Sequence, residues 1–223
     1  MKILKLLLII CLYCSNTFGQ KITIKTIESR LITNEGVEFI GDLKNKKKDH
    51  YSFKTWDNKG VLFLNSTKYL LSNINFNAST NSFDSRVDRK KMFSFKSEKL
   101  DSVIINNRLF KKIDSYFYEV LLEKGNNLFL RKHDIKISKG SINRLDLSEG
   151  QSSSSLAFRY LIKINNNFKK INLNKKSIFE LLVNSNDINE LEEFVQDKKL
   201  SYKKVNDIIK MLSFLIDKQS III

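Results

Sequence analysis

The sequence has no proline, and its 223 residues include only seven glycines, two cysteines and two histidines. So few glycines leave little room for the loops that cradle phosphates, and neither GxxxxGK[ST] nor GxGxxG occurs. His50 and His133 are the only histidines and there is no HExxH motif, so a zinc site would have to draw on distant carboxylates. We therefore expect no cofactor and no bound metal.

Both cysteines lie in the opening stretch MKILKLLLIICLYCSNTFGQ, which has the three parts of a signal peptide. Two lysines precede an apolar run, residues 6–13, that is shorter than the ~20 residues of a membrane-spanning helix, and small residues follow. The pattern predicts a signal peptide over residues 1–19, cleaved between Gly19 and Gln20. We accordingly expect an exported protein, periplasmic, envelope-associated or secreted, with no transmembrane helix after cleavage.

Cleavage at this point would leave a chain without cysteine, which excludes disulfides, a thiol nucleophile and thiolate metal sites together. The alternative is that Cys14 is kept and carries a lipid, in which case the protein would be anchored to a membrane. Neither Cys11 nor Cys14 has small residues immediately before it, so we predict that both are removed.

Positive charge is plentiful: 39 Lys and Arg residues stand against 24 Asp and Glu, for a formal net charge of +15. Such an excess is typical of proteins that bind nucleic acid or another anionic polymer. A sequence rich in Lys, Asn and Ile, with alanine only at Ala78 and Ala157, is also what an AT-rich genome produces regardless of function. The excess is spread along the chain, which favours the compositional explanation, and we do not expect nucleic acid as a partner.

Short alternating segments separated by turn residues fill the region from residue 20 to residue 137. With no helical period between them, such strands pair as antiparallel neighbours. We predict strands over residues 21–33, 37–40, 51–55, 61–64, 68–71, 74–76, 83–87, 92–95, 103–105, 108–113, 116–123, 128–132 and 135–137, with a charged hairpin tip at 44–49. The region is therefore predicted to be an antiparallel β domain of meander, sandwich or barrel-like form.

The chain changes character after this region. Residues 138–155, with two glycines and a serine run, are predicted to form a loop, and residues 156–173 a further β-hairpin. From residue 174 to residue 223 the apolar period becomes helical, with capping signals at Ser177, Asp187 and Ser201. The predicted fold class is α+β: an antiparallel β-rich body followed by a small C-terminal helical tail of two to three short helices.

Candidate catalytic groups are sparse. The serine run at residues 152–155 is not part of a G-x-S-x-G elbow. Asp84 with Asp88 falls in a weakly predicted strand or turn, and Glu192 with Glu193 on the solvent face of a helix, whereas general acid–base catalysis needs carboxylates in a partly desolvated cleft. We assign no catalytic residue; the sequence leaves open whether the protein is an enzyme and leans toward no.

Aromatic residues alternate with polar and basic ones at residues 92–96 and follow one another at 116–118. Exposed rings beside lysines can stack on bases or sugars. In β-strands, however, alternating aromatics more often belong to the core. The core assignment is the one that the pattern favours.

Two stretches resemble a group of uncharacterised exported proteins common in flavobacteria and other Bacteroidota: residues 116–137, YFYEVLLEKGNNLFLRKHDIKI, and residues 169–216. Those proteins pair a strand like FYEVL, residues 117–121, with a tail that begins in a Lys-rich hairpin. The tail continues with a helix starting like KKSI, residues 175–178, an acidic helix, and an ending like KLSYKK, residues 199–204, before a final apolar helix.

Gly19-Gln20 also resembles the usual cleavage site of these proteins, and the likeness extends weakly back to residues 56–76. The resemblance implies an envelope or secreted location. It implies no known activity, and it assigns no functional residue.

Together these features predict a non-enzymatic cell-envelope or secreted protein that mediates binding or assembly, with another envelope protein or an anionic polymer as its partner. One alternative is a basic β protein that binds an anionic envelope polymer or a lipid surface, which a compact basic patch and loss of binding with salt would support. A second alternative is a hydrolase with an unrecognised carboxylate site, which needs a deep pocket containing at least two convergent acidic groups.

Overall fold

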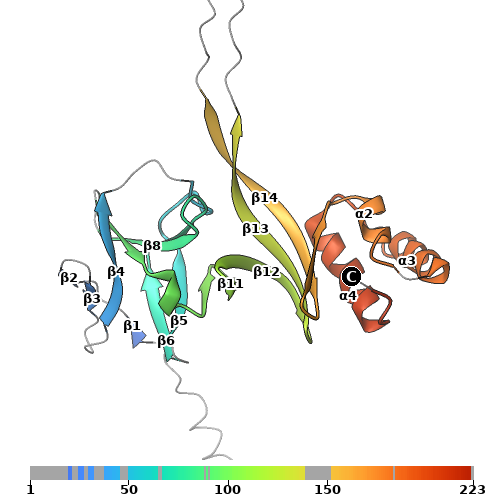
Figure 1. Cartoon of the computed structure of the whole chain (residues 1–223), viewed down its shortest axis with the longest axis horizontal. Coiled ribbons are helices and arrows are strands. Elements are labelled where there is room, and N and C mark those ends of the chain that lie inside the picture. Colours follow the sequence, from blue (N-terminus) through green and yellow to red (C-terminus); the bar gives the residue numbers. More distant parts are fainter. Residues whose placement is uncertain are drawn as a thin grey trace, which may run out of the picture.

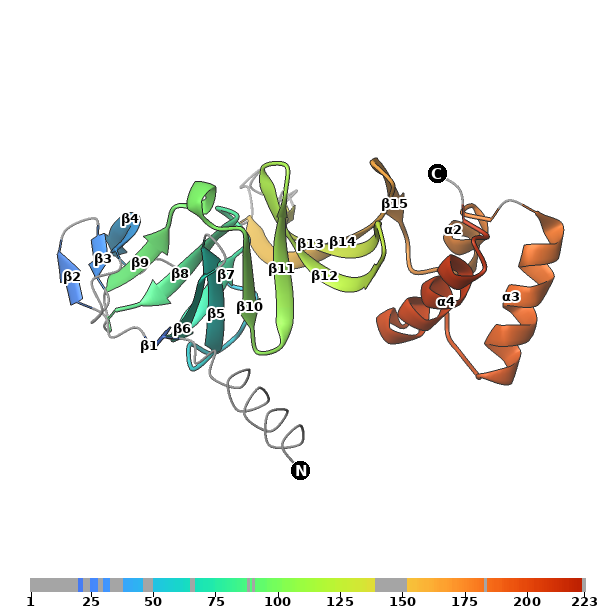
Figure 2. The same ribbon diagram turned by 90° about the horizontal axis from the view of Figure 1, so that it is seen from below.

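The computed structural model describes residues 20–21, 25–27, 30–32, 38–45, 50–64, 67–87, 89, 91–138, 152–182 and 184–221. At one end of the molecule two β-sheets pack against each other, and at the other end helices pack on two long strands, β13 (Asn127–Ser138) and β14 (Ser153–Ile164). Figure 2 shows the same strands connecting the two ends. The predicted signal peptide and most of the predicted loop at 138–155 lie outside the described residues.

The larger sheet runs through the whole molecule. Besides β13 and β14 it contains β1 (Gln20–Lys21), β5 (Lys59–Leu64), β6 (Thr67–Ser72), β10 (Ser102–Ile105), β11 (Arg108–Ile113), β12 (Tyr116–Lys124) and β15 (Asn167–Ile171). The order across it is β1-β6-β5-β10-β11-β12-β13-β14-β15. Neighbours pair antiparallel except at one edge, where β1 runs parallel to β6.

The smaller sheet is antiparallel throughout its described strands, in the order β2-β3-β4-β9-β8-β7. Its strands are β2 (Lys25–Ile27), β3 (Arg30–Ile32), β4 (Glu38–Asn45), β7 (Ile74–Asn77), β8 (Ser82–Arg86) and β9 (Lys91–Phe95), and the short 3-10 helix η1 (Ser97–Lys99) follows. The chain crosses from the larger sheet to the smaller one at Asn73, whose φ of 63° an asparagine tolerates better than most residues.

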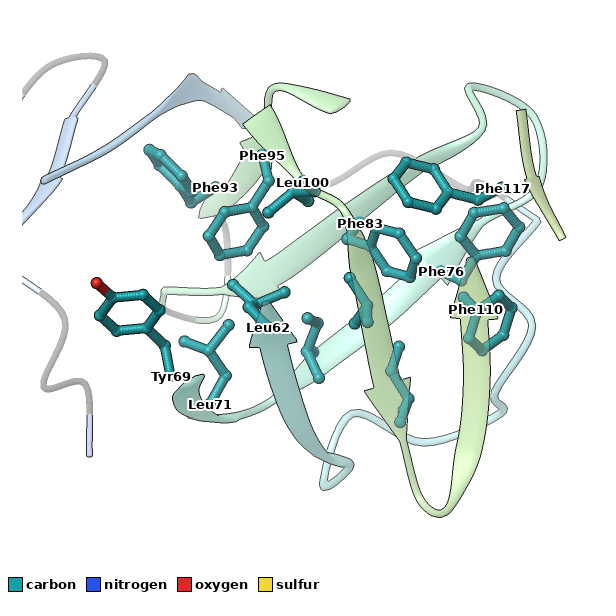
Figure 3. Close-up of a cluster of buried hydrophobic side chains, with 13 residues drawn as sticks. Leu62, Tyr69, Leu71, Phe76, Phe83, Phe93, Phe95, Leu100, Phe110 and Phe117 are labelled. Carbon is teal, nitrogen blue, oxygen red and sulfur yellow. The ribbon is translucent and has the colours of Figure 1, made fainter. Parts of the chain in front are cut away.

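Aromatic side chains from both sheets fill the space between them (Figure 3). Phe76 and Phe83 from the smaller sheet contact Phe110 and Phe117 from the larger one, with ring centroids 4.8 to 5.7 Å apart. All four rings are almost fully buried. Burial of one such side chain is worth about 1.5–3 kcal/mol relative to leaving it exposed. Of the aromatics at residues 92–96 and 116–118, Phe93, Phe95 and Phe117 belong to this core, as their pattern predicts, whereas Tyr116 is 46% exposed.

A second core lies at the other end, where three helices cover one face of the larger sheet. The helices are α2 (Lys175–Phe179), α3 (Ser185–Asp197) and α4 (Val205–Asp217). Phe129 of β13, Ile162 of β14 and Ile171 of β15 meet their apolar faces. Helices this short are marginal by themselves, so this packing stabilises them. The observed architecture confirms the predicted α+β class, with a β-rich body and a helical tail.

The predicted strand at residues 51–55 is wrong. These residues form bends, and only Tyr51 makes an isolated bridge, to Asn77. The predicted strand at 21–33 contains two described strands, since β2 and β3 pair with each other. Strand β14 begins at Ser153, within the predicted loop, and it pairs with β13 from Ser153 to Lys163 because β13 continues to Ser138 and offers the serine run a hydrogen-bonding partner.

The predicted helix caps also shift. Asn174, rather than Ser177, caps α2: its side-chain oxygen accepts a hydrogen bond from the backbone N–H of Ser177 at 2.8 Å. The last two helices begin at Ser185 and Val205, and neither has a side-chain cap at its start. None of the described helices is both long enough and apolar enough to cross a membrane.

Candidate functional site

His133 lies in the middle of β13, and its side chain is fully buried. The rings of Phe76, Phe110 and Phe158 surround the imidazole at centroid distances of 5.6, 5.5 and 5.0 Å. A polar ring in such apolar surroundings is stable only if its nitrogens have hydrogen-bond partners.

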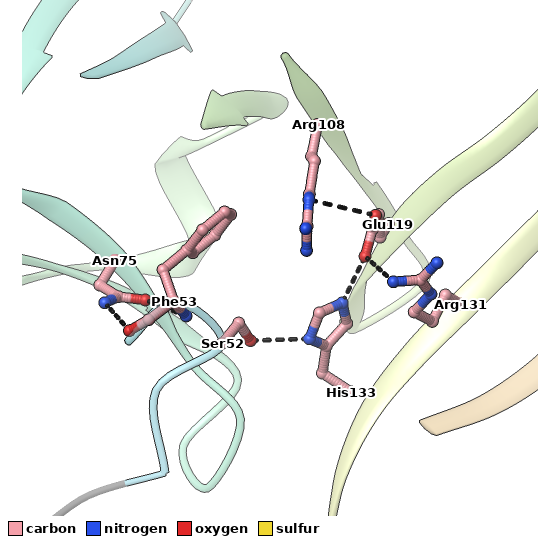
Figure 4. A network of polar contacts seen from close by, with 7 residues as sticks. All are labelled: Ser52, Phe53, Asn75, Arg108, Glu119, Arg131 and His133. Carbon is pink, nitrogen blue, oxygen red and sulfur yellow. Dashed lines mark hydrogen bonds and ion pairs between the residues drawn. The ribbon is translucent and has the colours of Figure 1, made fainter. Parts of the chain in front are cut away.

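Both nitrogens do have partners, as Figure 4 shows. His133 Nε2 lies 2.7 Å from Glu119 Oε2, and Nδ1 lies 2.7 Å from Ser52 Oγ. An ionised carboxylate only accepts hydrogen bonds, so Nε2 carries a proton and donates it to Glu119. In the neutral imidazole Nδ1 then accepts a hydrogen bond from the Ser52 hydroxyl.

Glu119 is held in its ionised form although its side chain is only 5% exposed. Arg131 NH1 lies 3.4 Å from its carboxylate and Arg108 Nε lies 3.9 Å from it. Burial alone would raise the pKa of Glu119, but the hydrogen bond from His133 and the positive charges of Arg131 and Arg108 outweigh it, so the pKa lies below its ordinary value. Arg131 also stacks on two rings, with its guanidinium 5.2 Å from Phe158 and 5.8 Å from Tyr160.

Ser52 belongs to the bent segment 50–58, which the side chain of Asn75 holds in place. Asn75 Oδ1 accepts a hydrogen bond from the backbone N–H of Phe53 at 3.1 Å, and its Nδ2 donates to the carbonyl of Phe53 at 2.8 Å. A side-chain amide thus makes the hydrogen bonds that a neighbouring strand would make. This is the physical reason that the alternating residues 51–55 are not a strand.

We call Ser52, His133, Glu119, Arg131 and Arg108 the buried network. Its order of serine, histidine and carboxylate is that of a serine hydrolase triad. The backbone N–H groups that could form an oxyanion hole beside Ser52 are already used: that of Ser52 donates to the Phe76 carbonyl and that of Phe53 to Asn75. With the imidazole fully covered as well, the geometry supports a role in fixing segment 50–58 against β12 and β13.

The opposite face of the same strands is open and basic. Side chains alternate along a strand, so Lys132 and Lys136 point away from the side that carries His133. Lys132 Nζ lies 4.1 Å from the ring centroid of Tyr116, and Lys163 Nζ 5.7 Å from that of Phe168. We call this surface the basic face. It comprises Lys111, Tyr116, Tyr118, Lys132, Lys136, Arg159, Lys163, Phe168 and Lys170.

Only part of the charge on the basic face is neutralised. Lys111 pairs with Glu123 at 2.6 Å, and Arg159 pairs with Asp134. The lysines without a carboxylate partner among the described residues are Lys132, Lys136, Lys163 and Lys170.

Two rings on this face are unusually open, since Tyr116 is 46% exposed and Phe168 is 38% exposed. Tyr118 belongs to β12, and its ring centroid lies 6.5 Å from that of Phe168 on β15. Partial burial, and then the carboxylate of Asp114, raise the pKa of Tyr118, so its hydroxyl stays protonated. The face therefore combines unpaired ammonium groups with aromatic surface.

The other residues considered from the sequence are scattered. His50 lies 3.3 Å from the Ser79 hydroxyl and does not join His133, while Asp84 is buried and accepts a hydrogen bond from the Tyr51 hydroxyl. Asp88 and the predicted cleavage site's Gly19 lie outside the described residues, and Gln20 forms part of β1. The run at 152–155 is exposed, and Glu192 and Glu193 lie on α3.

Sequence reasoning missed the buried network, although one signal for it was present. Glu119 and Arg131 are charged residues at strand positions whose neighbours two residues away, Phe117 and Phe129, are core residues. Charges at inward positions of alternating strands pair with each other in the fold. The participation of Ser52 had no such signal.

Among the grooves that lie away from the buried network, two bear on function. One of about 680 Å³ follows β5, β6 and β10 and is lined mainly by apolar residues, among them Val61, Leu70 and Ile104. The other, about 410 Å³, lies between α3 and the end of α4, and its lining includes Glu190, Glu193 and Asp197. Within the described part of the chain, no group of three or more His, Cys, Asp and Glu side chains could hold a metal ion.

The chain matches no protein-family model, no curated protein and no solved structure. Function is therefore argued from the buried network and the basic face.

Proposed function

We propose that this protein is a non-enzymatic, exported binding protein that holds an anionic polymer of the cell envelope on its basic face. The observation that carries the proposal is the set of unpaired lysines beside exposed rings on one face of β12–β15. The lysines are distant in the sequence, and the register of these strands gathers them.

Electrostatics and stacking act together on such a surface. Lysines that neutralise the charges of a polyanion release bound counterions, which makes affinity fall steeply with salt. Exposed rings add contact area that does not depend on salt. The helices and the smaller sheet cover the other side of the larger sheet. The lysines and rings of the basic face are therefore left open to a ligand.

The acidic groove between α3 and the end of α4 gives little support to a hydrolase. Glu190 forms an ion pair with Lys218, and Glu193 is exposed on the same helix. General acid–base catalysis needs carboxylates whose pKa values differ because they are partly desolvated. Nothing covers these groups in the described part of the chain.

The test is binding of the purified protein to fluorescent dextran sulfate, with neutral dextran as a blank, over a range of salt concentrations. Replacing Lys132, Lys163 and Lys170 by glutamine removes charge from the basic face only. We expect affinity to fall by about tenfold or more, given ~0.5 kcal/mol for each exposed charge contact. The dependence on salt becomes shallower in the same variant.

A matched control removes the same charge elsewhere. Lys176, Lys203 and Lys204 are exposed on the helical tail, and their replacement by glutamine lowers the net charge equally. The control variant should keep most of the affinity. Equal losses in the two variants, or binding that salt does not affect, would refute the proposal. Export is tested separately by mass spectrometry of the native N-terminus, where we expect Gln20 and where a lipidated Cys14 would contradict it.

A further inference from the structure

Strand β14 has one edge that is open over more than half of its length. It begins at Ser153, but β15 pairs with it only from Tyr160 onwards. From Ser153 to Arg159 it pairs with β13 on one side, and no described strand pairs with its other side. Figure 1 shows these parts of β13 and β14 extending beyond both the sandwich and the helices. Such an edge presents backbone N–H and C=O groups with which another strand can pair.

We call residues 153–159 the open edge. Proteins protect exposed edge strands with proline, bulges and charged side chains, lysine above all. The open edge reads SSSLAFR: it has no proline, it pairs with β13 without a register shift, and Arg159 is its only charge. That charge is already paired with Asp134 of the same chain. The neighbouring edge strand β15, NFKKI, carries two lysines instead. The open edge therefore lacks the features that keep a strand unpaired.

Apolar side chains lie beside the open edge. The register places Ile135 opposite Leu156, and His133 opposite Phe158, so these residues share one face of the two strands with Ile137. Ile137 is 70% exposed and Phe158 is 43% exposed. Removing such surface from water is favourable. A strand added at the open edge would satisfy backbone groups and cover part of this apolar face at the same time.

A second copy of the same strand fits this edge. Because β15 occupies β14 from Tyr160 onwards, the longest antiparallel overlap of residues 153–159 with themselves is centred on Leu156. Leu156 then faces the partner's Leu156, and Ile135 on each side extends the row across four strands. Arg159 faces the partner's Ser153, so no charge meets a like charge across the seam. The edge is thus complementary to itself, as a two-fold symmetric interface requires.

We infer that this protein forms a dimer in which the open edges of two copies pair antiparallel. Seven residues a side are far fewer than the roughly 20–30 of a standard interface, so the dissociation constant should be micromolar, on the order of 10 μM. The two-fold axis between antiparallel strands is perpendicular to the sheet, so the basic faces of the two copies lie on the same side. A long polyanion could then contact both of them, but dimer formation itself does not depend on the proposed function.

The experiment is sedimentation equilibrium of the purified protein without any polyanion, from about 1 to 100 μM, a range that brackets this affinity. We expect the mass to rise with concentration from that of one chain towards that of two. Leu156→Lys and Leu156→Glu each place like charges opposite each other at the centre of the seam. Each should weaken dimer formation about tenfold or more, and mixing the two variants should restore it because the charges then attract.

The matched control is Leu70→Lys. Leu70 is 40% exposed on β6, away from the open edge, and its replacement adds the same charge. This variant should dimerise as the wild type does. Circular dichroism checks that each variant is folded, and recovery of the dimer on mixing requires that both Leu156 variants are.

Hydrogen exchange of the wild type tests the seam without any substitution. Amides within residues 153–159 should exchange more slowly at about 100 μM than at about 1 μM, on either side of the expected affinity, whereas those of β15 should not change. Unchanged exchange in the open edge would overturn the inference. So would a dimer that persists in both Leu156 variants, or a protein that is monomeric throughout, which would leave the edge to a strand of another protein. A monomer that still binds dextran sulfate would leave the proposed function intact, so the two proposals fail separately.

Discussion

Glu119 of β12 contacts two side chains of β13, the buried His133 and the mostly buried Arg131. Its carboxylate orients the imidazole of His133 and balances the charge of Arg131, whose side chain is only 16% exposed. A buried charge that loses its partner costs far more than an exposed one. Exposed ion pairs of this protein, such as Lys111 with Glu123, should therefore matter much less.

The first prediction concerns the charge of Glu119. Glu119→Gln keeps a similar shape but leaves Arg131 uncompensated, so we expect the free energy of unfolding in urea to fall by about 3 kcal/mol or more. Glu123→Gln, which breaks an exposed pair on the same strand, should cost less than about 1 kcal/mol. Equal costs for the two variants would mean that the buried network does not stabilise the fold.

The second prediction is a pH dependence. The folded-state pKa of Glu119 is lower than its ordinary value of about 4.3, so its stabilising contribution is complete above that pH and is lost as the pH falls through the folded pKa. Urea unfolding of the wild type and of Glu119→Gln should thus differ most near neutral pH. The difference should shrink below about pH 4.3; a constant difference would contradict the assignment.

At the scale of elements, the helices of the tail differ in how they begin. Asn174 caps α2 with its side chain, whereas Asn184 at the start of α3 makes no side-chain cap hydrogen bond. Because α2 carries Ile178 into the second core, the cap also positions that core. The two asparagines form a natural pair for comparison.

The third prediction is that Asn174→Ala lowers the free energy of unfolding by about 1 kcal/mol, since the backbone N–H of Ser177 loses its acceptor. Asn184→Ala should change the free energy of unfolding by only a few tenths of a kcal/mol, because Asn184 makes no such hydrogen bond. The measurement is urea unfolding followed by circular dichroism. A larger loss in Asn184→Ala would show that the cap hydrogen bond is not what stabilises α2.

At the scale of the whole molecule, one sheet serves two cores. Phe117 of β12 packs in the sandwich core, while Phe129 of β13 packs under the helices, and the buried network lies between them. Loss of either core would expose part of a strand that the other core needs. The molecule should therefore unfold as one cooperative unit.

The fourth prediction follows from this arrangement. Trp56, the only tryptophan, contacts Tyr51 at a centroid distance of 4.7 Å and reports on the sandwich end, while the helical circular dichroism signal reports on the tail. We expect the two signals to change together over the same range of urea concentration. Loss of the helical signal at lower urea, with Trp56 fluorescence unchanged, would show that the two ends unfold independently.

Most strands could be predicted from the sequence because alternation is local. The hairpin around residues 106–107 and the strands at 74–76 and 92–95 lie close to where their patterns place them. Residues 51–55 have the same alternation, but the side chain of Asn75 takes their hydrogen bonds, and no local pattern records that competition. Ser153 to Ser155 were predicted as loop because serine is common in loops, yet β13 offers them a partner.

The sequence by itself determined the class of the fold and the places of most strands and of the helical tail, because alternation and the helical period are properties of neighbouring residues. Tertiary structure alone decided which polar side chains meet. Ser52, Glu119 and His133 come from three separate segments, and their contacts depend on strand register. The same register turns lysines scattered along the chain into one basic face, because only strand pairing decides which distant residues share a side of a sheet.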